Sequence, residues 1–103
     1  MPHYRHIVQF KLDSSLSPEE IETVYRAFKA KIEALPAHIP TIQRIEVSLN
    51  LNPKESWHVC LFSEFASLEE INDYSIHPLH LEAVKEIKPY LAERSCTDCL
   101  SAL

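Results

Sequence analysis

Glycine is missing from all 103 positions of the chain. Globular proteins average about 7% glycine. The P-loop and the dinucleotide-binding fingerprint both need glycine where the backbone approaches a phosphate. The sequence therefore excludes these phosphate-binding motifs, and its turns must depend on proline, asparagine, aspartate and serine.

Cysteines are few, and acidic residues outnumber basic ones. Three cysteines, behind an N-terminus without the apolar core of a signal peptide, do not indicate a disulfide framework. The net charge is −5, and the Lys and Arg residues form no basic stripe, which argues against a nucleic-acid partner. No apolar run approaches the roughly 20 residues that span a bilayer. We therefore expect a cytoplasmic protein with no nucleic-acid or membrane partner.

The length and composition fit one small domain. The chain is 46% hydrophobic and 24% charged, which is ordinary for a globular protein. A chain of this length supports one hydrophobic core but not two. We expect a single domain over residues 1–103.

Hydrophobic periodicity predicts four strands and two helical regions. Apolar residues recur at helical spacing after Ser17–Glu20 and after Ser67–Glu70, and each of these segments has the pattern of a capping box. Pro78 must disturb the second helix. Period-two alternation or continuous apolar character predicts strands over residues 4–12, 41–51, 57–65 and 91–100.

The order β-α-β-β-α-β predicts a fold class. It is the ferredoxin-like α+β arrangement, a four-stranded antiparallel sheet with both helical regions on one face. The third strand carries large apolar side chains on both faces, including Leu61 on one and Phe62 on the other. An open apolar sheet face needs a partner, and a second copy packing sheet to sheet is the simplest one. We therefore predict a homodimer.

Titratable groups cluster between Asp73 and His80, next to the helix-breaking Pro78. An imidazole with an ordinary pKa near 6.5 suits proton abstraction beside a carbonyl, so His80 is a candidate base. Tyr74 would hydrogen-bond the developing enolate oxygen. The alternative is that both are buried polar groups, bonded to the backbone or to each other. We expect His77, which precedes proline, to cap the next helical segment.

Two further histidines lie on predicted strands. If His6 and His58 both point beneath the helices, they line one pocket with Tyr74, His77 and His80. The sequence also permits a zinc or nickel site of His6, His58 and His80, since neutral imidazole binds both ions. No carboxylate or cysteine is obviously placed to complete it, and we expect neither a metal nor a cofactor.

The C-terminal segment contains cysteines with CxxC spacing. Cys96 and Cys99 lie on a predicted strand, where positions three apart face opposite sides. Their sulfurs would diverge, so we do not expect a redox pair.

Four segments together carry a resemblance to a known family over essentially the whole chain: Arg5–Lys11, Ser67–Glu70, Tyr74–His80 and Arg94–Asp98. In these segments the chain resembles the stress-responsive A/B barrel (Dabb) domain family. It implies a dimeric α/β barrel built from two ferredoxin-like protomers. Most members have no assigned reaction.

One plant branch of that family contains a cofactor-free polyketide cyclase. The resemblance implies catalytic roles for Tyr74 and His80 and pocket-lining roles for His6 and His58. We therefore expect a small-molecule pocket and cyclase- or lyase-type acid–base chemistry on a carbonyl or polyketide-like compound. The alternatives are a non-catalytic stress-associated assembly protein and a cofactor-free monooxygenase, an activity of other dimeric ferredoxin-like families.

Overall fold

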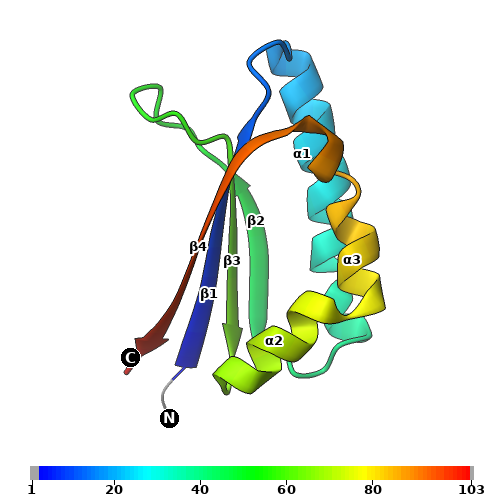
Figure 1. Ribbon diagram of the computed structural model, residues 1–103, viewed down its shortest axis with the longest axis vertical. Helices are drawn as coiled ribbons and strands as arrows, with labels where there is room; N and C mark the ends of the chain where they lie inside the picture. Colours follow the sequence, from blue (N-terminus) through cyan, green and yellow to red (C-terminus); the bar gives the residue numbers. More distant parts are fainter. Residues whose placement is uncertain (1–2, 103) are drawn as a thin grey trace.

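The computed structural model describes residues 3–102, so residues 1, 2 and 103 of the predicted domain lie outside the described part. Strands and helical regions follow the predicted order β-α-β-β-α-β (Figure 1). Two short 3₁₀ helices, η1 and η2, follow the helical regions. The elements are β1 (His3–Leu12), α1 (Pro18–Glu33), η1 (Leu35–Ala37), β2 (Arg44–Leu49), β3 (Val59–Phe65), α2 (Leu68–Ile76), α3 (Pro78–Val84), η2 (Lys88–Tyr90) and β4 (Leu91–Ser101).

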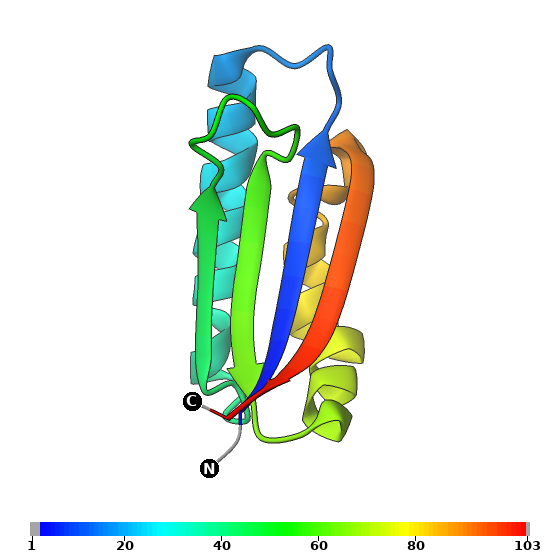
Figure 2. The ribbon, with the colours of Figure 1, turned by 90° about the vertical axis from the view of Figure 1, so that its left-hand side faces the viewer.

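The four strands form one sheet in the order β2-β3-β1-β4, and every neighbouring pair is antiparallel. Figure 1 shows the helices together on one side of the sheet. Figure 2 shows the other side, which no helix of residues 3–102 covers. This is the predicted ferredoxin-like arrangement, and β2 and β4 are its edge strands.

The core lies between the sheet and the helices. Side chains of β1 alternate, so that every second residue from His6 to Leu12 is buried. The buried stripe of α1 packs against them because its apolar residues recur every three or four positions. The main members are Val8, Phe10, Leu12, Val24, Phe28, Ile32, Val59, Leu61 and Phe65.

Caps and proline fix the helix ends. At the start of α1, Ser17 and Glu20 form a reciprocal capping box, with Pro18 in the first turn. Pro78 divides the second helical region into α2 and α3. His77 between them has ψ 134° because the proline ring disfavours helical geometry in the preceding residue.

Two strands are shorter than the sequence predicts. β2 covers Arg44–Leu49 rather than residues 41–51, and β3 begins at Val59 rather than at position 57. The Asn50 side chain explains part of the difference. Its amide nitrogen donates to the carbonyls of Asn52 and Trp57, and its oxygen accepts from the Asn52 N–H. These bonds form a turn and end the regular ladder.

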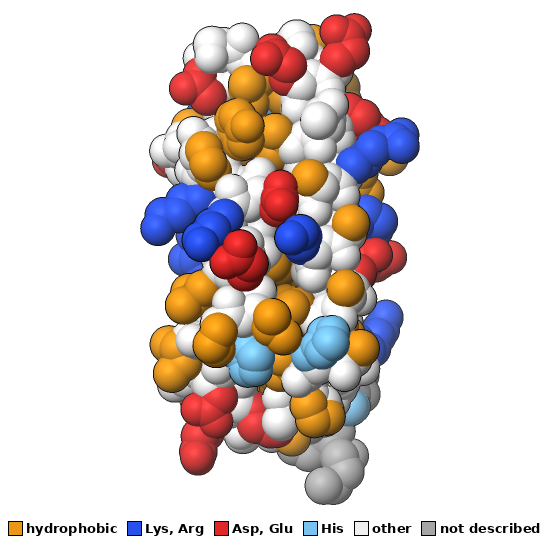
Figure 3. All heavy atoms as spheres, turned by 90° about the vertical axis from the view of Figure 1, so that its right-hand side faces the viewer, with side chains coloured by type: hydrophobic (Ala, Val, Ile, Leu, Met, Phe, Trp, Pro, Cys, Tyr) orange, Lys and Arg blue, Asp and Glu red, His pale blue; other side chains and the backbone are white. Residues whose placement is uncertain are grey.

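The helical face has a mixed surface. Figure 3 shows hydrophobic side chains over the helices, separated by a band of charged ones. Ile76 and Leu81 are among the exposed apolar residues there. Within residues 3–102, no helix combines the length and apolar composition of a membrane span. The cytoplasmic location stays a prediction.

Candidate functional site: a buried tyrosine between two histidines

Tyr74 lies between the imidazoles of His6 and His80. It follows Ile71 by one helical turn on the buried stripe of α2, and its side chain is completely buried. The ring centroids of Tyr74 and His80 are 4.4 Å apart, and those of Tyr74 and His6 are 5.9 Å apart. The structure therefore brings together three of the residues that the sequence singled out.

His80 is held in one tautomer. Its Nδ1 lies 3.0 Å from the Ser75 carbonyl oxygen at the end of α2. A carbonyl only accepts, so Nδ1 carries the proton, and Nε2 of the neutral ring keeps its lone pair. Burial lowers the pKa of His80, and His6, Arg94 and His77 lower it further, while the Ser75 bond opposes them. At neutral pH, His80 is therefore an uncharged base.

The Tyr74 hydroxyl is unusual in a folded protein. Its Oη is buried and has no hydrogen-bond partner within residues 3–102. Leaving a buried polar group unpaired costs about 1–3 kcal/mol, so such groups need an explanation. Burial raises the pKa of the phenol well above its ordinary value, which keeps it protonated and able to donate.

His6 makes contacts that the sequence did not predict. Its Nδ1 lies 2.6 Å from Asp98 Oδ1 and 3.6 Å from Cys96 Sγ. Both partners are on β4, where His6 pairs with Asp98 and its neighbour Val8 pairs with Cys96. Burial raises the pKa of the Cys96 thiol, and the negative charge of the nearby Asp98 raises it further. Alternation along β4 predicts that Cys96 and Asp98 share a face, but only the β1–β4 register places them at His6.

The structure does not bring His58 to this cluster. His58 precedes β3, and its Nδ1 accepts from the Leu12 N–H at 2.9 Å. His6 is opposite Ser63, five residues further along the same antiparallel pair. At about 3.3 Å per residue, His58 lies roughly 16 Å along the strand from that position. The zinc or nickel site of His6, His58 and His80 that the sequence permitted therefore does not form.

His77 has the predicted capping role. It is the N-cap of α3, and its Nδ1 accepts from the Leu79 N–H at 3.1 Å. A part for His77 in lining a pocket stays a prediction.

The cavities described between residues 3 and 102 lie elsewhere in the molecule. Their volumes range from about 280 to 720 Å³, and none of them is lined by His6, Tyr74 or His80. The inner face of β4 is nevertheless accessible beside the cluster, because Leu100 is 60% exposed and the Asp98 side chain 35%. His80 is itself half-buried.

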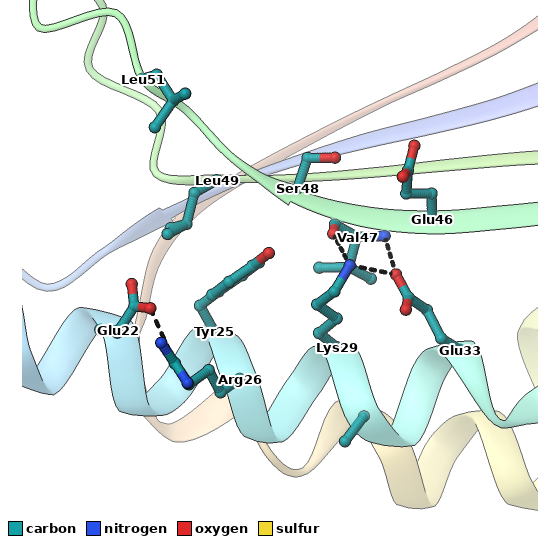
Figure 4. Close-up of a pocket in the computed structure, with 11 residues that line it drawn as sticks. Glu22, Tyr25, Arg26, Lys29, Glu33, Glu46, Val47, Ser48, Leu49 and Leu51 are labelled. Atoms are coloured by element: carbon teal, nitrogen blue, oxygen red, sulfur yellow. Dashed lines mark hydrogen bonds and ion pairs between the residues drawn. The ribbon is translucent and has the colours of Figure 1, made fainter.

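The largest of these cavities, about 720 Å³, lies between α1 and β2 (Figure 4). Lys29 Nζ donates to Glu33 Oε2 at 2.6 Å and to the Val47 carbonyl at 2.8 Å. The Val47 N–H donates to the same Glu33 oxygen at 3.0 Å. These charged side chains satisfy each other and the outer backbone groups of Val47 on β2, so we assign them a structural role.

Comparisons with known proteins decide the family. The family model of the stress-responsive A/B barrel (Dabb) domain matches residues 4–101. The chain belongs to the Dabb family. Among curated proteins, none matches this Dabb chain.

Solved structures share the fold over nearly the whole length. A dimeric ferredoxin-like protein of unknown function from Bacteroides fragilis is 43% identical over 94% of both chains, with a TM-score of 0.90. A Dabb protein from Mesorhizobium loti is 25% identical over 96% of both chains, with a TM-score of 0.69.

A hydroxynitrile lyase from Passiflora edulis is 20% identical over 96% of this chain and 93% of its own, with a TM-score of 0.72. At that identity the likeness shows the fold alone. The Dabb neighbours therefore fix the architecture and leave the reaction to be argued from the site.

Proposed function

We propose that this Dabb protein is a homodimeric, cofactor-independent acid–base catalyst acting on a carbonyl or polyketide-like compound. The observation that carries the proposal is the buried, unpartnered hydroxyl of Tyr74 beside His80. A protein gains nothing in stability from such a hydroxyl, whereas a carbonyl oxygen of a substrate would satisfy it.

The two side chains divide the chemistry. His80 Nε2 takes a proton from the carbon beside a carbonyl, and the electron pair of the broken C–H bond forms an enolate. The Tyr74 O–H donates a hydrogen bond to the enolate oxygen as its negative charge develops. In a cyclisation, the enolate carbon then attacks a second carbonyl of the same molecule, and protonated His80 returns its proton to the resulting alkoxide.

The position of the pair supports this division. The Ser75 carbonyl holds His80 in the tautomer that a base requires, and burial keeps that ring uncharged. Burial also keeps the Tyr74 phenol protonated. The Passiflora protein is a hydroxynitrile lyase, which supports the view that this fold is compatible with an enzyme.

Exchange of α-protons tests the proposal without knowledge of the substrate. Alkyl and aryl ketones and β-keto thioesters are incubated in D₂O with the protein, and loss of the α-proton signal is followed by NMR. We expect the wild-type protein to accelerate exchange for one compound class, and His80→Gln to abolish the effect. The matched control is His38→Gln, which changes an exposed histidine outside the cluster. This variant should accelerate α-proton exchange as wild type does.

The main alternative is a non-catalytic assembly protein. The complete burial of Tyr74 and the position of the described cavities on other faces favour it. Under this alternative no compound in the panel exchanges or binds, and His80→Gln lowers the melting temperature instead. That combination of results would remove the catalytic proposal.

A further inference from the structure

A histidine, a cysteine and an aspartate converge on one point beside β4. The donor atoms His6 Nδ1, Cys96 Sγ and Asp98 Oδ1 all lie within 4.8 Å of one another. The histidine is buried, whereas the cysteine and the aspartate face solvent. From this arrangement we propose that the trio is a binding site for a zinc ion, with a fourth position open to solvent.

The spacing of the donors is close to that of a tetrahedral zinc site. Usual zinc bonds are about 2.3 Å to sulfur and about 2.0–2.2 Å to nitrogen and oxygen. In a tetrahedral site, a nitrogen or oxygen ligand therefore lies about 3.6 Å from the sulfur, and the nitrogen and oxygen ligands lie about 3.4 Å from each other. Here sulfur lies 3.6 Å from Nδ1 and 3.8 Å from Oδ1. Two of the three separations therefore already fit.

The third separation must widen. Nδ1 and Oδ1 are 2.6 Å apart because they share a hydrogen bond. A zinc ion would replace that shared proton, and the two atoms would move apart by about 0.8 Å to reach tetrahedral spacing. The Asp98 side chain is partly exposed, so it can rotate by this amount without disturbing the core.

The donor types select the ion. Imidazole, thiolate and carboxylate together suit Zn²⁺, while magnesium and calcium prefer oxygen ligands alone. The thiolate and the carboxylate carry two negative charges, which balance the charge of the ion. On binding, the Cys96 thiol proton leaves to solvent, and the His6 ring proton moves from Nδ1 to Nε2. Three protein ligands with an accessible fourth position are the pattern of zinc sites that bind water or a substrate.

The site is separate from the proposed acid–base pair. His6 contacts the Tyr74 ring edge-on, but neither His80 nor the Tyr74 hydroxyl belongs to the trio. The inference therefore holds or fails independently of catalysis by His80, and its test needs no substrate.

Zinc binding by the full chain tests the inference. Protein freed of metal with a chelator is titrated with Zn²⁺ by calorimetry, and with Co²⁺ while the absorption spectrum is recorded. We expect saturable binding of one ion per chain at micromolar metal. Co²⁺ should give a thiolate charge-transfer band and the intense visible bands of tetrahedral coordination.

Two exposed ligands and one neighbouring thiol supply the variants. Cys96→Ser and Asp98→Asn should each weaken Zn²⁺ binding by at least about 10-fold, and Cys96→Ser should remove the charge-transfer band. The matched control is Cys99→Ser, which removes an exposed thiol from the opposite face of the same strand. It should bind Zn²⁺ like wild type.

Three results would overturn the inference. They are the absence of saturable binding, unchanged binding by Cys96→Ser, and equal weakening by Cys96→Ser and Cys99→Ser. The last would mean that exposed thiols bind the ion without a built site. Because the substituted ligands are surface groups on β4, a loss of binding can be separated from unfolding by circular dichroism of the same samples.

Discussion

Removal of the Tyr74 hydroxyl should have opposite effects on the stability and on the proposed activity of the protein. Tyr74→Phe removes a buried group that has no hydrogen-bond partner within residues 3–102. We expect the free energy of unfolding to rise by about 1 kcal/mol, because the desolvation cost disappears while ring packing is kept. Urea denaturation measures this change.

The control for this substitution is Tyr25→Phe, at a half-buried tyrosine of α1. It should change the free energy of unfolding little. If Tyr74→Phe instead destabilises the protein by 1 kcal/mol or more, on the order of a lost hydrogen bond, the hydroxyl has a structural partner and the donor role loses its basis.

His80 predicts a pH dependence with a definite sign. Its pKa in the folded protein is lower than its ordinary value of 6.5, chiefly through burial. Below pH 6.5 the unfolded chain therefore binds more protons at this position than the folded chain, and stability falls as the pH falls. Any turnover that needs the neutral ring is lost over the same range, below pH 6.5.

Two measurements check this dependence. NMR titration of the His80 ring should give a pKa below 6.5, and the loss of stability between pH 7 and pH 5 should be smaller in His80→Gln than in wild type. A ring that titrates above 6.5 would contradict the prediction.

At the scale of elements, the junction between α2 and α3 depends on His77. Its ring accepts from the Leu79 N–H, which would otherwise be an unpaired donor at the start of a helix. His77→Ala should lower the free energy of unfolding by about 0.5–1 kcal/mol, whereas His77→Asn should restore most of it because asparagine is a preferred N-cap.

The same pair of variants separates capping from a part in the site. If His77→Asn keeps the stability but loses α-proton exchange or ligand binding, the imidazole itself is needed and the role is more than structural. If both properties survive, capping accounts for His77.

Alternation and capping patterns in the sequence were enough to locate most elements, but not to bring the site together. The parity of β1 places His6 on the same face as Val8, and the structure buries both. His58 has the same parity as Cys60 and Phe62, which lie on the outer face of the sheet. Alternation in the sequence therefore argues against a position of His58 beneath the helices. Helical spacing from Tyr74 and Ile71 would also place Leu68 on the inward stripe of α2, yet Leu68 is half-exposed because it opens the helix.

The partners of His6 required long-range information. Cys96 and Asp98 are about ninety positions away along the chain, and only the pairing of β1 with β4 aligns them with His6. A shift of one residue in that register would turn both side chains to the other face. The sequence alone contains the strands but does not fix their register.

At the scale of the whole molecule, the uncovered sheet face is where we expect the second copy. Phe62 lies there, with the guanidinium groups of Arg5 and Arg44 within 6 Å of its ring. Glu64 lies between these arginines, 3.4 Å from Arg5 and 3.7 Å from Arg44. This face combines an aromatic group with paired charges, as interface cores and their rims do.

Sedimentation tests the dimer. At micromolar concentration we expect a species of twice the 11.9 kDa chain mass. Phe62→Glu should shift it to the monomer, because the substitution removes the aromatic side chain from the interface and buries a charged group there. The matched control places the same substitution on the helical face, Leu81→Glu at a half-exposed position, and should stay dimeric. A wild-type species near the single chain mass would rule out the sheet-to-sheet dimer.

The contact of Lys29 and Glu33 with Val47 has a consequence beyond packing. An edge strand whose N–H and C=O groups are unpaired is a template on which other extended chains polymerise. Here two side chains of α1 occupy the N–H and C=O groups of Val47 on β2. Acetylation of Lys29, or a movement of α1 away from the sheet, would uncover the template. Protection of this edge against fibril growth is therefore shared between the strand and an ion pair carried by a helix.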